Sequence, residues 1–247
     1  MSAGAGTRRF RVHRYLRDDG PSHVDEFDVP AGEASTVLEG LRWIEVHADR
    51  SLVIRHSCFH ASCGTCGVRV NGREGLACVT PVTTDTVTVE PLANIPVLAD
   101  VVVDMRPFVE RFPPQHPLLR ISEARAGGQE TVSGQETVGG EETGTAEDPE
   151  RFEDCIECGL CLSACPIAAT DDRYVGPAAL AWAQRVLEEP RGEDVDAVLA
   201  WADDEHGAWQ CHAAFECTEA CPSEVLPAQR IMKLRRELTR RRLGASS

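Results

Sequence analysis

The sequence has no apolar run long enough to cross a lipid bilayer. A membrane-spanning helix needs about 20 consecutive apolar residues, whereas the apolar stretch at 95–103 is short and contains Asp100. The first ten residues also lack the apolar core of a secretory signal. We therefore expect a chain of a reducing compartment, one that would be held at a membrane only by another, anchoring chain.

Motifs that would give the chain a substrate site of its own are also missing. The sequence has no glycine-rich phosphate loop, no dinucleotide-binding fingerprint and no serine–histidine–aspartate cue. Forty acidic against 25 basic residues give a net charge of −15, which disfavours nucleic acid binding. Basic residues gather at 230–242, as either a solvated helix face or a contact with anionic lipid or an acidic partner.

Cysteine, in contrast, is abundant and clustered. The eleven cysteines fall into three groups, with four at 58–78, four at 155–165 and three at 211–221. Disulfide frameworks belong mostly to short secreted chains, whereas clustered cysteines in a reducing compartment usually bind metal. The three groups are therefore predicted to be metal sites.

The first group has the spacing of a plant-type [2Fe–2S] site. Its pattern is C-x4-C-x2-C-x11-C, in which one loop supplies three thiolates and a distant segment supplies the fourth. Gly64 and Gly67 stand beside ligands, where the backbone must bend close to the cluster. A structural zinc site is the alternative, although zinc pairs are usually C-x2-C twice, and His60 is interpreted as a neighbour. The predicted ligands are Cys58, Cys63, Cys66 and Cys78.

The other two groups form a pair of bacterial ferredoxin runs. The first run, at 155–166, reads C-x2-C-x2-C-x3-C-P, and the fourth cysteine of such a run binds the cluster of its partner run. The second run, at 211–222, repeats this frame with Ala214 in place of the second cysteine. Crossed ligation predicts a [4Fe–4S] site at Cys155, Cys158, Cys161 and Cys221, and another site at Cys165, Cys211 and Cys217.

Ala214 determines the type of the last site. Alanine cannot bind iron, so three thiolates remain, and a [3Fe–4S] cluster is the economical interpretation. A [4Fe–4S] cluster with water or His212 on its unique iron is the alternative, and the pair as a whole could instead hold zinc or no metal. The three sites use all eleven cysteines. No thiol remains as a nucleophile, and the chain is predicted to conduct electrons without a catalytic residue of its own.

Hydrophobic patterns around the cysteines predict secondary structure of two kinds. Thr36 and Glu39 fit a capping box at the start of a helix, and Asn71-Gly72 is a strong hairpin signal. Pro107 is expected to interrupt a helix at 99–112, and Pro177 suits a first helical turn. The remaining expectations are strands at 10–15, 25–29, 68–70 and 84–89, and helices at 194–202 and 227–242.

These elements predict an α+β chain of two domains. Strands around one helix, followed by a cysteine-rich loop, suit a β-grasp [2Fe–2S] ferredoxin domain at 1–104. An all-α domain like a bacterial ferredoxin would follow at 105–125 and 149–247. Between these two parts, residues 126–148 hold a degenerate GQETVS-type hexad without an apolar face. We predict this segment to be a disordered insertion, because it cannot bury enough surface to offset its ordering entropy.

The combined motifs resemble those of the iron–sulfur subunits of succinate dehydrogenase and fumarate reductase. The likeness extends beyond the ligands to R-H-S-C at 55–58, C-G-T-C at 63–66 and L-A-C at 76–78. It also includes the inter-domain segment at 96–105 and the stretch at 173–180. The resemblance covers nearly the whole chain apart from the low-complexity insertion.

The resemblance implies a role in electron transfer within a larger enzyme. A partner flavoprotein would oxidise succinate on FAD. Electrons would then pass through the [2Fe–2S], [4Fe–4S] and [3Fe–4S] clusters to quinone at a membrane anchor subunit. The chain would lie peripherally on the cytoplasmic face of the inner membrane. His212 matches a family position near the quinone and the third cluster.

Other roles remain compatible with the motifs. The ligand spacing does not distinguish succinate oxidation from fumarate reduction. An iron–sulfur linker subunit of another flavin dehydrogenase or heterodisulfide-reductase-like complex, or a free soluble ferredoxin, would carry similar cysteines. A free ferredoxin has little use for two modules and a basic tail.

Two departures from the family pattern are visible. Phe59 and Ala61 stand where familiar members have arginine and glycine in the first cluster loop, which changes the hydrogen bonding available to that cluster. Pro166 is followed by I-A-A-T, without the quinone-contacting tryptophan of many members. The quinone site is therefore expected to be arranged differently or to lie largely in the anchor.

Overall fold

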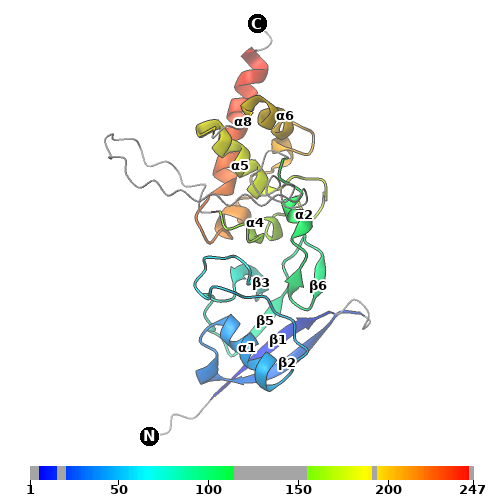
Figure 1. Ribbon diagram of the computed structural model, residues 1–247, viewed down its shortest axis with the longest axis vertical. Helices are drawn as coiled ribbons and strands as arrows, with labels where there is room; N and C mark the ends of the chain where they lie inside the picture. Colours follow the sequence, from blue (N-terminus) through cyan, green and yellow to red (C-terminus); the bar gives the residue numbers. More distant parts are fainter. Residues whose placement is uncertain (1–5, 16–20, 114–154, 191–193, 245–247) are drawn as a thin grey trace, which may run out of the picture.

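The computed structural model describes residues 6–15, 21–113, 155–190 and 194–244. Two modules follow one another along the long axis of the molecule (Figure 1). The N-terminal module is built on strands β1–β5 and helix α1, and the C-terminal module on helices α4–α8. The predicted insertion at 126–148 lies outside the described residues.

A five-stranded mixed sheet forms the centre of the N-terminal module. Its order is β2-β1-β5-β3-β4, with β1 parallel to β5 and the other neighbours antiparallel. Phe10 and Val12 on β1 and Val87 and Val89 on β5 are buried, since alternate residues of a strand face the same side. The strands are β1 Thr7–Arg14, β2 His23–Pro30, β3 Gly67–Val70, β4 Arg73–Leu76 and β5 Thr86–Glu90.

Helix α1, Val37–His47, packs on this sheet and confirms the predicted capping box. The Thr36 hydroxyl accepts from the Glu39 amide, and the Glu39 carboxylate accepts from the Thr36 amide at 2.9 Å. Gly40 allows close approach, because a β-carbon there would lie 2.1 Å from the Phe10 ring. The predicted Asn71-Gly72 hairpin is also confirmed, with φ of 51° and 81° between β3 and β4.

The helix expected at 99–112 is wrong for most of its length. Val97–Ala99 (β6) pairs with Val102–Val103 (β7), and only Arg106–Val109 (α2) is helical. Asp100 adopts a left-handed φ of 47° in the turn between the two strands. Pro107 lies in the first turn of α2, so it starts this helix and does not interrupt a longer one.

Asp100 is held in this turn by partners distant in sequence. Its carboxylate is fully buried and accepts from the Arg14 guanidinium at 3.0 Å, the Tyr15 amide at 3.0 Å and the Val53 amide at 2.7 Å. Arg14, itself buried, also pairs with Asp25 and Asp49. This network joins the end of β1 to the loop that precedes the first cysteine group.

The C-terminal module is helical, as predicted. The expected helices at 177, 194–202 and 227–242 are confirmed, and the Asp194 carboxylate caps α6 by accepting from the Ala197 amide. No helix among the described residues is long and apolar enough to cross a membrane. The helices are α4 Leu160–Ser163, α5 Pro177–Glu188, α6 Val195–Ala202, α7 Glu216–Glu219 and α8 Pro227–Gly244.

Asn94 joins the two modules. Its side-chain amide donates to the carbonyl oxygens of Leu162 at 2.9 Å, Ser163 at 3.0 Å and Cys165 at 3.1 Å. The Ser163 hydroxyl in turn accepts from the Ala93 amide at 2.8 Å. The carbonyl groups at the end of α4 are thus satisfied by the N-terminal half of the chain, which orients the first ferredoxin run against it.

We predict that Asp100→Asn destabilises the protein by about 3 kcal/mol, because it leaves buried Arg14 with a weaker partner and turns an amide donor toward at least one backbone N–H group, that of Val53 or that of Tyr15. A urea titration followed by far-UV circular dichroism measures this loss. Asp25→Asn is the matched control on the same arginine. The Asp25 side chain is 40% exposed, so its loss should cost about 1 kcal/mol or less. Equal losses for the two variants would contradict the role given to Asp100.

Candidate metal centres

The first cysteine group lies around the start of β3. Cys58, Cys63 and Cys66 lie on the loop between α1 and β3, and the Cys58 sulfur accepts from the Ser62 and Cys63 amides at 3.3 Å each. Cys78 follows β4 and interacts with Cys66. A hydrogen bond of 3.0 Å from the Ala77 amide to the Cys66 carbonyl holds these two segments together. The structure therefore brings the hairpin cysteine to the loop cysteines.

The electrostatic environment differs across this group. The His60 amide, helped by those of Cys63 and Ser62, lowers the pKa of Cys58 to about 7. Burial raises the pKa of Cys66 to about 12. Backbone amides thus stabilise a thiolate on the exposed side of the loop, whereas a thiolate on the buried side needs compensating positive charge.

The two residues that depart from the family pattern shape this loop. Phe59 and Ala61 have left-handed φ values of 63° and 61°, a conformation that costs free energy for any residue with a side chain. The Phe59 ring is 46% exposed and lies 5.5 Å from the Arg42 guanidinium carbon and 5.1 Å from the His56 ring. The imidazole Nδ1 of His60 contacts the carbonyl oxygen of Cys58.

The second group lines a small pocket in the C-terminal module. Burial raises the pKa of Cys155 to about 12, that of Cys158 to about 11 and that of Cys161 well above its usual range. Cys221, from the second run, interacts with all three. The cavity is lined by Cys155, Cys158, Cys161 and Cys221, the set expected from crossed ligation.

The third group lines a separate small pocket. Burial raises the pKa of Cys217 to about 12 and also raises that of Cys165. Cys165, from the first run, interacts with Cys211 and Cys217 of the second. The cavity is lined by Cys165, Cys211 and Cys217, with His212 and Ala214 beside them.

The backbone of the second run repeats that of the first. Glu157 and Gly159 have φ of 52° and 79°, and the corresponding Ala213 and Phe215 have φ of 55° and 66°. Each run then enters a four-residue helix, α4 or α7. Ala214 therefore occupies the place that Cys158 has in the first run. A glycine at 159 indicates a left-handed residue from the sequence alone. The matching left-handed residue of the second run is Phe215, which could not be predicted, because phenylalanine rarely adopts a positive φ.

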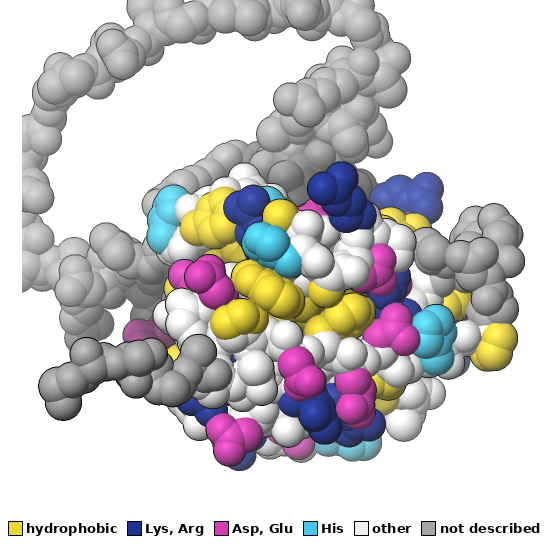
Figure 2. Space-filling view, turned by 90° about the horizontal axis from the view of Figure 1, so that it is seen from below, with side chains coloured by type: hydrophobic (Ala, Val, Ile, Leu, Met, Phe, Trp, Pro, Cys, Tyr) yellow, Lys and Arg dark blue, Asp and Glu magenta, His cyan; other side chains and the backbone are white. Residues whose placement is uncertain are grey.

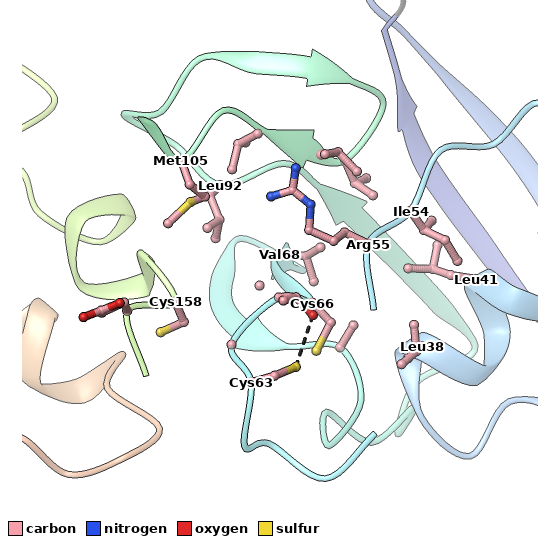
Figure 3. A pocket seen from close by; sticks show the side chains of 18 residues that line it. Leu38, Leu41, Ile54, Arg55, Cys63, Cys66, Val68, Leu92, Met105 and Cys158 are labelled. Atoms are coloured by element: carbon pink, nitrogen blue, oxygen red, sulfur yellow. Dashed lines mark hydrogen bonds between the residues drawn. The ribbon is translucent and has the colours of Figure 1, made fainter. Parts of the chain in front are cut away.

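The first two groups meet at a cavity of about 100 Å³ between the modules. Cys63 and Cys66 lie on one side of it and Cys158 on the other (Figure 3). Gly64 makes the approach close: a β-carbon there would lie 2.8 Å from the Ile156 carbonyl oxygen and 2.9 Å from the Cys158 β-carbon. The two cysteine loops thus touch through a residue that has no side chain.

The donor sets fit iron–sulfur clusters. In the second and third groups, thiols from two separate runs line each cavity, and burial opposes their ionisation unless a metal supplies positive charge. Thiolate is the ligand that iron–sulfur clusters take. Among the residues that the structure describes, no three His, Cys, Asp or Glu side chains are placed to bind a single metal ion.

Comparisons with known proteins agree with this arrangement. The 2Fe-2S iron-sulfur cluster binding domain family matches residues 9–110, and the 4Fe-4S dicluster domain family matches residues 151–225. The fold and the cysteine groups therefore define a protein with a 2Fe-2S domain followed by a 4Fe-4S dicluster domain.

Curated relatives narrow this class. The fumarate reductase iron-sulfur subunit of Mycobacterium tuberculosis is 37% identical, over 84% of this chain and 82% of the relative. That of Escherichia coli O6:H1 is 33% identical, over 91% and 90%. The succinate dehydrogenase iron-sulfur subunit of Coxiella burnetii is 30% identical, over 86% and 88%. The chain belongs to the family of fumarate reductase and succinate dehydrogenase iron–sulfur subunits.

A solved structure supports the same fold. One chain of the Mycobacterium smegmatis Sdh1 complex in the apo form matches with a TM-score of 0.75, covering 96% of this chain and 98% of that one. The two chains are 24% identical. The arrangement of the two modules is therefore shared with that chain, despite low sequence identity.

We predict that Gly64→Ala destabilises the protein more than Gly72→Ala. Both glycines have left-handed φ, 70° and 81°, so each substitution costs about 1–2 kcal/mol of conformational energy. Only Gly64 faces backbone across the module boundary; a β-carbon at Gly72 meets nothing within 4 Å. The added overpacking should cost about 1–3 kcal/mol more. Thermal unfolding of both variants measures the difference, and equal shifts would show that the close approach is unimportant.

Proposed function

We propose that the chain is the electron-transfer subunit of a succinate:quinone oxidoreductase. It would relay electrons from FAD in a partner flavoprotein to quinone at a membrane anchor subunit. The observation that carries the proposal is the order of the three cysteine groups. The first lies in the N-terminal module, the second directly across the module boundary from it, and the third beyond the second. This order supports a path through the molecule without a substrate-converting site on the chain.

The proposal assigns each group a cluster. Bound at these sites, the clusters would supply one-electron carriers whose potentials are set by cluster type, charge and hydrogen bonds. A β-grasp domain at 1–104 would hold the first, and an all-α ferredoxin domain at 105–125 and 149–247 the others. The ligands are Cys58, Cys63, Cys66 and Cys78 for [2Fe–2S], Cys155, Cys158, Cys161 and Cys221 for [4Fe–4S], and Cys165, Cys211 and Cys217 for [3Fe–4S].

The surface of the N-terminal module supports contact with a partner. Phe59 and Val79, one residue after Cys58 and Cys78, are 46% and 49% exposed. Figure 2 shows the N-terminal module from below, where hydrophobic side chains gather between histidine and charged residues. Exposed apolar groups beside the first cysteine group favour burial against another protein. We assign this end to the flavoprotein.

The opposite end is assigned to the quinone and the anchor. His212 lies beside the third cysteine group, next to Pro166 and Ile167 along the same cavity. The position expected to carry a quinone-contacting tryptophan is occupied by smaller residues, so the anchor would supply more of the quinone site. Held by that anchor, the chain would lie peripherally on the cytoplasmic face of the inner membrane. The same ligands serve succinate oxidation and fumarate reduction.

The proposal predicts that the chain co-purifies with a flavoprotein and an anchor when it is expressed with its neighbouring genes. Anaerobically prepared complex should contain iron and acid-labile sulfide. Low-temperature EPR should show a three-iron signal after oxidation and a [2Fe–2S] signal after reduction. Elution of the chain alone at its own mass, 26.9 kDa, would indicate a free ferredoxin. Zinc without sulfide would remove the electron-transfer function altogether.

We predict that Ala214→Cys converts the third cluster to a four-iron type. The second run already has the backbone conformation of the first, so a cysteine at 214 would stand where Cys158 stands. EPR of the oxidised protein should lose the three-iron signal, and the iron content should rise. Ala213→Cys is the matched control, because it adds the same thiol at a position whose counterpart, Glu157, is not a ligand. Retention of the three-iron signal in Ala214→Cys would contradict the assignment.

A further inference from the structure

A guanidinium group lies against the third cysteine group from the side of the basic C-terminal helix. Arg235 on α8 donates from Nη1 to the Cys211 carbonyl oxygen at 2.9 Å. Its side chain is partly buried between α8 and the 3₁₀ turn at Ala208–Gln210. In the sequence, Arg235 is one of several basic residues at 230–242. In the structure, its side chain contacts Cys211, a proposed cluster ligand.

Trp209 fixes the position of this guanidinium. The Arg235 guanidinium carbon lies 5.2 Å from the centre of the Trp209 ring, a cation–π distance. The Trp209 indole N–H donates to the Asp203 carboxylate at 2.6 Å, and Arg242 covers the same ring at 4.7 Å. The ring is therefore held from two directions, and Arg235 is held against it beside Cys211.

The charge of Arg235 is not cancelled by a carboxylate in the part of the chain that the structure describes. Three arginines in the last turns of α8 are paired with carboxylates: Arg240 and Arg241 with Glu237, and Arg242 with Asp203. The acidic group that acts on the third site from the other side is Glu216, which interacts with Cys165. On the Cys211 side, the site therefore has a guanidinium without an ion-pair partner among the described residues.

We propose that Arg235 raises the reduction potential of the [3Fe–4S] cluster and so makes the third site the electron acceptor of the relay. The inference rests on the proposed function. One-electron reduction adds one negative charge to a cluster, and a nearby cation stabilises that added charge. Because the guanidinium is partly buried, salt screens this interaction less than it would an exposed one.

The electron balance of the relay shows why this placement matters. Each electron that arrives at the third site leaves the [4Fe–4S] cluster, which is oxidised by one electron. Two such electrons, with two protons, reduce one quinone. A higher reduction potential at the third site shifts the equilibrium of electron transfer from the [4Fe–4S] cluster toward the third cluster, which lies nearer the quinone. Arg235 is a positioning residue in this sense, since it acts through Cys211 and the cluster and touches no substrate.

Arg235→Gln tests the proposal in the assembled complex. A redox titration followed by EPR should show a lower midpoint potential for the three-iron signal, with the other two clusters unchanged. Arg236→Gln is the matched control, because it removes the same charge from the next residue, which is exposed and has no hydrogen bond or ion pair among the described residues. Arg235→Lys keeps the charge and should titrate close to the parent.

A second variant covers the case in which Arg235→Gln does not load the third cluster. Trp209→Leu keeps the Arg235 charge but removes the ring that holds it, so the midpoint potential should fall by a smaller amount. The proposal is overturned if Arg235→Gln binds the third cluster and its midpoint potential is unchanged. If Arg235→Gln does not bind the cluster, an unchanged midpoint potential in Trp209→Leu overturns the proposal. An equal shift of the midpoint potential in Arg236→Gln also overturns it. Absence of the three-iron signal from the parent protein would instead overturn the proposed ligand assignment.

Discussion

The two cysteine loops touch at Gly64, and this contact sets how closely the two modules approach each other. Electrons cross between carriers only over short distances, so the modules must bring their cysteines together without side chains in between. Gly64 meets Ile156 and Cys158 at backbone distance, and Asn94 holds the end of α4 with three hydrogen bonds. Both contacts lie at the boundary between the two modules, where they hold the first and second cysteine groups together.

A second constraint is the burial of the thiols. Burial raises the pKa of most cysteines in the second and third groups, so these sites disfavour thiolate until iron supplies positive charge. Cluster binding and folding of the C-terminal module are therefore expected to be coupled. The first loop differs, because the backbone amide of His60, with those of Cys63 and Ser62, already favours a thiolate at Cys58.

The sequence predicted those features that short segments determine. The capping box at Thr36, the Asn71-Gly72 hairpin and the frame of the two ferredoxin runs depend on neighbouring residues, and the structure contains them. The helix expected at 99–112 failed because Asp100 is turned by Arg14 and Tyr15, which lie more than eighty residues away. The module boundaries and the ligand sets remain predictions, although the structure brings the expected cysteines together.

The two ferredoxin runs share a backbone, so the difference between their sites must come from side chains. Each run has left-handed residues at matching positions and enters a short helix. Ala214 stands where the first run has Cys158, which leaves three cysteines for the proposed third cluster. Arg235 adds a cation beside Cys211. The first change sets the number of available thiolates, and the second places a positive charge beside one of the proposed ligands. Two runs with nearly the same backbone thus form two different sites, and a few side chains account for the difference.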